Sequence, residues 1–185
     1  MTSDPISDDN FDASVRTVQI LNGAMFAGVL MFLLIVIFVR SSGKDGLLSG
    51  KPLSLAAPVP LVGVVMAIIC PLLASVVPGL VVRNARRAIA SGTWKPPQGN
   101  SQPGPAPASD AGRFLAVYTT QRIIALALLE AAAFFNLVAF MIEGQALSLV
   151  LAAVLLGCLL IGFPTPGRVA QWVDNQLELM RTEPQ

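Results

Sequence analysis

Long apolar runs alternate with short polar stretches along this chain. Four runs are nearly free of charge, and they cover about residues 17–39, 58–82, 123–142 and 146–163. Each is close to the roughly 20 residues with which an α-helix crosses a hydrocarbon core about 30 Å thick. The pattern predicts an all-α integral membrane protein with four transmembrane helices, arranged as two tandem hairpins.

Short polar segments divide the two hairpins. The runs of the second hairpin are separated only by Glu143-Gly144-Gln145, which predicts a tight turn between neighbouring helices. Hairpin 1, with a basic segment at its end, occupies residues 17–90, and hairpin 2 occupies residues 113–163.

The segments outside the hairpins have other patterns. Residues 1–16 are acidic and polar, which predicts a disordered N-terminal tail. Residues 91–112 are rich in Pro, Gly and Ser, which predicts a flexible linker. In residues 164–185, Thr165 and Pro166 form a helix start signal, and apolar residues then recur at helical spacing opposite charged ones. This predicts an amphipathic interfacial helix, whose apolar face is Val169, Trp172, Val173, Leu177 and Met180.

The two hairpins also resemble each other. With an offset of 103 residues, Ala24 aligns with Ala127 and Gly28 with Ala131, and the second helices align at an offset of 94. The agreement predicts an internal duplication. Chance similarity between Leu-rich helices is the alternative.

Basic residues beside the runs set the expected orientation. With the N-terminus inside, nine basic residues are cytoplasmic and three are outside, so we expect both termini in the cytoplasm. The nine are Arg16, Arg83, Arg86, Arg87, Lys95, Arg113, Arg122, Arg168 and Arg181, and the three are Arg40, Lys44 and Lys51. Of these, Arg83, Arg86 and Arg87 form a cluster suited to an anionic membrane surface.

Composition narrows the function. Charged residues make up 12% of the chain, against about 25% in soluble domains, and hydrophobic residues make up 54%. A net charge of +1, without a basic patch interleaved with aromatics, argues against a nucleic-acid binder. The chain has no His, and Cys70 and Cys158 lie inside apolar runs, so we expect no metal, haem or other cofactor. The Ala- and Leu-rich composition suits a bacterial inner (plasma) membrane.

Glu130 is a carboxylate deep within the third run. It lies eight residues past Arg122, about 12 Å along a helix. A charged side chain there costs about 2.5–3.5 kcal/mol or more, so we expect Glu130 to be protonated or bonded to Asn22, Gln19, Ser75 or Arg122. Glu130 and Asn22 are the candidate intramembrane polar site. The roles open to Glu130 are an ion or proton site, a buried residue that fixes packing or recruits a subunit, and an acid without function.

Small residues on the first and third runs predict close helix packing. The alternative is that Gly and Ala are simply common in membrane helices. The candidate packing residues are Gly23, Ala24, Ala27, Gly28, Ala127 and Ala131.

The string EAAAFFNLV, residues 130–138, resembles the carboxylate-bearing helix of the rotary ATPase proteolipid family. In that helix an acid is followed by small residues, an aromatic residue and Leu-Val. The matching acid of the family carries the coupling proton or ion, so the resemblance implies that role for Glu130. It covers about ten residues.

These features favour a non-enzymatic, multi-pass membrane protein, a small scaffold or accessory subunit of a membrane complex. Its expected partners are the lipid bilayer and either further copies of this chain or other membrane subunits. The alternative is an ion or proton translocating subunit that uses Glu130. An enzyme acting on lipids comes third, because the cytoplasmic segments offer only Arg and scattered acids.

Overall fold

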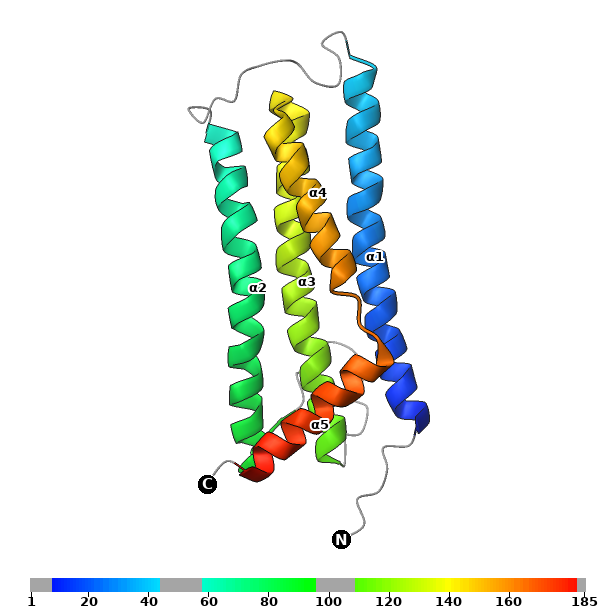
Figure 1. The fold of residues 1–185 in the computed structure, drawn as a ribbon, viewed down its shortest axis with the longest axis vertical. Coiled ribbons are helices and arrows are strands. Elements are labelled where there is room, and N and C mark those ends of the chain that lie inside the picture. The colour runs from blue at the N-terminus through cyan, green and yellow to red at the C-terminus, as the bar shows by residue number, and fades with distance from the viewer. Residues whose placement is uncertain (1–7, 44–57, 96–108, 183–185) are drawn as a thin grey trace. The chain divides into compact units, whose positions relative to one another are not determined.

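The computed structural model describes residues 8–43, 58–95 and 109–182, and all the regular structure in these ranges is helical. There are five helices in the described residues (Figure 1). They are α1 (Asp8–Ser41), α2 (Pro58–Ala90), α3 (Asp110–Glu143), α4 (Ala146–Ile161) and α5 (Pro166–Thr182). The all-helical prediction is confirmed. Residues 1–7 of the predicted tail and 96–108 of the predicted linker lie outside the described residues.

Three helices, α1, α2 and α3, are long and apolar enough to cross a membrane. The number rises to four if α4 and α5, which follow each other after a short break, are taken as one bent pair. Helix α4 has only 16 residues, so it is too short to count as a membrane-spanning helix by itself. The predicted helix at residues 168–181 is confirmed as α5.

The chain forms two compact units. Unit 1 consists of Met1–Ile20, Val76–Ile124 and Pro164–Gln185, and unit 2 of Leu21–Ser75 and Ala125–Phe163. Helices α1, α2 and α3 each contribute to both units.

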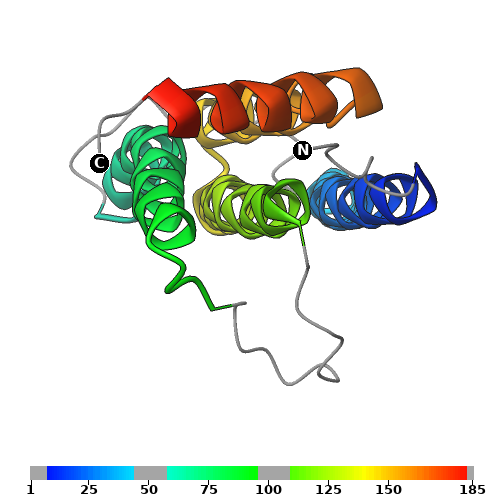
Figure 2. The same cartoon turned by 90° about the horizontal axis from the view of Figure 1, so that it is seen from below.

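In unit 2, α3 is the central helix and lies between α1 and α2 (Figures 1 and 2). In its most apolar stretch 44% of the residues are buried, against 17% in α1 and in α2. Its small residues, such as Ala132 and Ala133, are fully buried and let neighbouring helices approach closely. The buried core of unit 2 comprises Val29, Val36, Cys70, Leu126, Ala132, Ala133, Leu137, Phe140, Ala152, Leu155 and Leu159.

In unit 1, α5 crosses α3 (Figure 2). Its Val169 packs in one cluster with Val15 of α1 and Leu115 of α3. One turn later, Val173 packs in a second cluster with Phe114 of α3 and Ile89 of α2. Two turns of α5 therefore join three other helices in this unit.

The helices extend beyond the predicted spans. The predicted disordered tail is wrong from Asp8 onward, because residues 8–16 are the first turns of α1. Phe11 and Val15 lie one turn apart and pack in the cluster of unit 1 that also contains Leu115 and Val169. This packing stabilises the first turns of α1. The acids Asp8 and Asp9 also suit a helix N-terminus.

Helix α2 likewise runs unbroken through Pro71 and Pro78 to Ala90. Gly92, two residues past its end, has a φ of 69°, a conformation that often terminates helices. The predicted basic segment is therefore helical. Helix α3 begins at Asp110, inside the segment predicted as linker.

Truncating the core of unit 1 tests this arrangement. Phe114→Ala removes a side chain with no exposed area and should lower the free energy of unfolding by about 3–5 kcal/mol. The measurement is unfolding of the detergent-solubilised protein followed by circular dichroism. Leu179→Ala, at a partly exposed position of α5, is the control and should change the free energy of unfolding by less than about 0.5 kcal/mol. Equal effects of the two variants would contradict the packing described here.

Candidate functional site

Glu130 lies on α3 in unit 2, where α1 passes close by. A Cβ built on Gly28 would lie 3.8 Å from the Glu130 Oε1 atom, an ordinary van der Waals distance, so the carboxylate lies beside α1 here. The side chain is half-buried. Among the residues that the structure describes, none forms a hydrogen bond or ion pair with it.

None of the four predicted partners bonds to Glu130 in the described part of the chain. Gln19 Nε2 donates to the Pro164 carbonyl at 2.9 Å, and Ser75 Oγ donates to the Leu72 carbonyl of its own helix at 2.7 Å. Asn22 is buried in unit 2, and its Oδ1 atom accepts no hydrogen bond from the described residues. Arg122 belongs to unit 1. The other half of the expectation, that Glu130 is protonated, stays a prediction.

Most of the predicted packing residues lie on open faces. Gly23 has no neighbouring atom within 4 Å of a built Cβ. Of the two glycines, Gly28 approaches another helix, at Glu130. The four alanines of the set are exposed, and they are Ala24, Ala27, Ala127 and Ala131. Within the described residues they are free to contact lipid or another chain.

A polar contact that the sequence analysis did not single out joins α2 and α3. Asn136 is fully buried, and its Nδ2 atom donates to the Gly63 carbonyl at 3.1 Å and to the Ala132 carbonyl at 2.9 Å. A Cβ built on Gly63 would lie 2.9 Å from Asn136 Oδ1, so the site accepts no side chain without movement. The sequence does show a single Asn inside an apolar run, but it does not reveal the partner, which is 73 residues away.

The turn of hairpin 2 is as predicted. Helix α3 ends at Glu143 and α4 begins at Ala146. Gly144 has a φ of 70°, and its N–H donates to the Phe140 carbonyl at 2.8 Å. Gln145 Nε2 donates to Glu143 Oε2 at 3.3 Å. The Arg40 guanidinium of α1 lies 5.8 Å from the Phe140 ring centre, within cation–π range.

Basic residues, tryptophans and the tyrosine collect in unit 1. All nine basic residues expected on the cytoplasmic side belong to it. In the predicted surface cluster, Arg83 and Arg87 are exposed and Arg86 is half-buried. Both tryptophans and the single tyrosine of the chain also belong to unit 1, and they are Trp94, Trp172 and Tyr118.

Metal-ligating side chains do not gather within the described ranges. No group of three or more His, Cys, Asp or Glu residues there could hold a metal ion. Cys70 is buried and Cys158 exposed, and both are free thiols.

Comparison of the chain with protein-family models, with curated proteins and with solved structures gave no match.

A double-mutant cycle tests the contact between Asn136 and Gly63. Gly63→Ala should lower the free energy of unfolding by about 1–3 kcal/mol, because the new methyl group meets the Asn136 amide. In an Asn136→Ala background, Gly63→Ala should lower the free energy of unfolding by much less. The measurement is denaturant unfolding in detergent. Additive effects would show that the two positions do not interact.

Proposed function

We propose that this chain is a non-enzymatic, multi-pass membrane protein that serves as a scaffold or accessory subunit of a membrane complex. Unit 2 spans the bilayer in this proposal, and unit 1 lies at the cytoplasmic surface. The observation that carries it is the concentration of basic residues, Trp and Tyr in unit 1 and the scarcity of charge in unit 2.

Charge is scarce in unit 2. Its described residues carry only Arg40, Glu130 and Glu143, and the first and last of these stand at helix ends. Unit 1 holds nine of the twelve basic residues together with Trp94, Trp172 and Tyr118. Apolar runs, cytoplasmic Lys and Arg, and interfacial Trp and Tyr are the three features by which membrane proteins are oriented.

Four spans follow from this arrangement. Helices α1, α2 and α3 exceed the length that a bilayer requires. The 16 residues of α4 cover about 24 Å, somewhat less than a hydrocarbon core of about 30 Å. A helix that is oriented along the membrane normal, with local thinning of the bilayer, accommodates this mismatch at a small cost in free energy. Helix α5 then lies along the cytoplasmic surface, and both termini are cytoplasmic. The internal duplication stays a prediction.

The outer faces of unit 2 support a role in assembly. Helix α2 exposes four large apolar side chains at helical spacing, Leu61, Val65, Ile68 and Leu72. Such a face suits lipid tails or the helix of another subunit. The buried polar side chains of Asn136 and Gln145 bond to the chain itself, which supports a part in holding helices together.

A second candidate function rests on Glu130. This half-exposed carboxylate has no bonded partner in the described part of the chain and stands beside Gly28. Proton or ion translocation would use it as the carrier site, with the rest of the path supplied by other chains.

Cysteine labelling tests the proposed topology. Ser42→Cys, Arg87→Cys and Glu178→Cys place thiols at exposed positions in a background that lacks Cys70 and Cys158. In bacterial spheroplasts, a membrane-impermeant maleimide should label the first variant and should label the other two only after permeabilisation. Labelling of Arg87→Cys or Glu178→Cys before permeabilisation would contradict the proposal.

Glu130→Gln separates the two candidate functions. If Glu130 serves packing or assembly, Gln preserves its hydrogen-bonding shape, and the variant should copurify with the same partners in polymer-extracted lipid particles analysed by native mass spectrometry. Proton flux through reconstituted vesicles should be unchanged. Glu143→Gln is the matched control at the hairpin turn. Intact assembly together with a loss of flux would favour translocation instead.

A further inference from the structure

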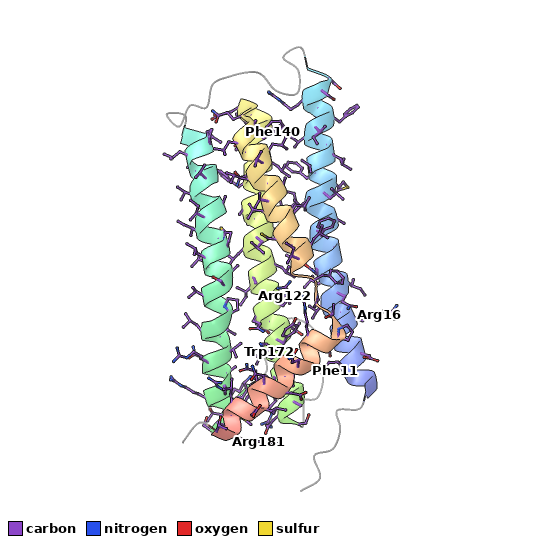
Figure 3. The ribbon with its side chains drawn as sticks, in the orientation of Figure 1. Phe11, Arg16, Arg122, Phe140, Trp172 and Arg181 are labelled. Carbon is purple, nitrogen blue, oxygen red and sulfur yellow. The ribbon has the colours of Figure 1, made fainter. Side chains whose placement is uncertain are left out.

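Two arginines and two aromatic residues of unit 1 come from neighbouring turns of α3 and α5. Tyr118 and Arg122 are one turn apart on α3, and Arg168 and Trp172 are one turn apart on α5. The Tyr118 and Trp172 rings are 5.2 Å apart, which brings the two pairs together where α5 crosses α3. Burial raises the pKa of the Tyr118 hydroxyl, and the positive charges of Arg122 and Arg168 act in the opposite direction. In Figure 3, Arg122 and Trp172 lie close to this crossing.

Neither arginine is neutralised by the described residues. The Arg122 Nε atom is buried and has no acceptor there, although buried donors are nearly always paired. Arg168 is exposed and forms no ion pair. Asp174 and Glu178, which line a surface pocket together with Arg168, do not pair with it.

The neighbouring acids of α3 do not compensate for these charges. Asp110 is paired with Arg113 at 3.0 Å, and no acid follows on α3 before Glu130. Two arginines here therefore have no ion-pair partner among the described residues, and one buried donor is unpaired. A ligand with several acceptor oxygens and negative charge fits this set.

We propose that Arg122, Arg168 and Tyr118 form a binding site for a phosphate group, with Trp172 beside it. Guanidinium groups bind phosphate oxygens through paired N–H donors, and the Tyr118 hydroxyl adds another donor. Arg122 immediately precedes the apolar run that begins at Ile123. The site therefore lies at the level of lipid headgroups, and this placement rests on the proposed function. The phosphate comes from an anionic phospholipid headgroup or from a soluble phosphate.

Fluorescence of Trp172 tests the site directly. Trp94→Phe leaves Trp172 as the single tryptophan. The full chain with this change is reconstituted into phosphatidylcholine vesicles that contain a small fraction of brominated phosphatidylglycerol or the same fraction of brominated phosphatidylcholine. We expect the anionic lipid to quench Trp172 selectively. Arg122→Gln and Arg168→Gln should each weaken the apparent affinity for it about fivefold, the equivalent of about 1 kcal/mol.

Matched variants separate a specific site from general charge. Arg181→Gln removes the same charge from an exposed position later on α5 and should leave the selectivity intact. Arg168→Lys should retain most of it. If Arg122→Gln does not fold, the exposed Arg168 still provides the test, because its removal leaves no packed contact missing.

Each outcome decides the matter. Loss of selectivity in the two site variants but not in Arg181→Gln supports a lipid phosphate. If inorganic phosphate shifts Trp172 emission in vesicles of phosphatidylcholine alone, and chloride at equal ionic strength does not, the site takes a soluble phosphate. Equal quenching by both lipids without a phosphate response overturns the site but leaves the membrane role standing. No quenching by either lipid overturns the membrane role as well.

Discussion

Close packing on α3 is the constraint on which both units depend. Helix α3 supplies residues to every buried cluster of the described chain, Leu126 and Phe140 in unit 2, and Phe114 and Leu115 in unit 1. Inside a bilayer the hydrophobic effect does not drive helices together, so contact must come from small side chains and from hydrogen bonds between helices. Ala132 and Ala133 provide the first, and Asn136, bonded to Gly63, provides the second. Because α1 and α2 both pack on α3, α3 is the most buried of the three helices and the other two expose more of their surface.

The sequence predicted what depends on local pattern. Apolar run lengths gave the helices, the Glu143-Gly144-Gln145 segment gave the turn, and the spacing from Val169 onward gave α5. Local pattern failed where distant contacts decide the structure. The turns from Asp8 to Arg16 look disordered because their polar residues show no periodicity, yet Phe11 and Val15 find partners on α3 and α5.

The polar site shows the same division between local and distant information. An isolated acid such as Glu130 is visible in an apolar run, but the sequence does not reveal which helix faces it. The structure places a glycine, Gly28, beside it, and in the described residues none of the four polar partners expected bonds to it. Conversely, the reason for a glycine at position 63 becomes clear only from the structure, in which Asn136 lies against its α-carbon. Without an alignment of related chains, neither pairing could be read in advance.

The short break between α4 and α5 shows how a chain can leave an apolar segment without exposed backbone groups. The Gly162 N–H donates to the Cys158 carbonyl and the Val169 N–H to the Thr165 carbonyl. The Pro164 carbonyl, which no helix satisfies, accepts from the Gln19 side chain of α1. Since unpaired backbone groups are costly away from water, these three bonds stabilise the break. They also help to fix the start of α5, and with it the position of Trp172 against Tyr118. A backbone requirement of the break therefore helps to determine where α5 places Arg168 and Trp172.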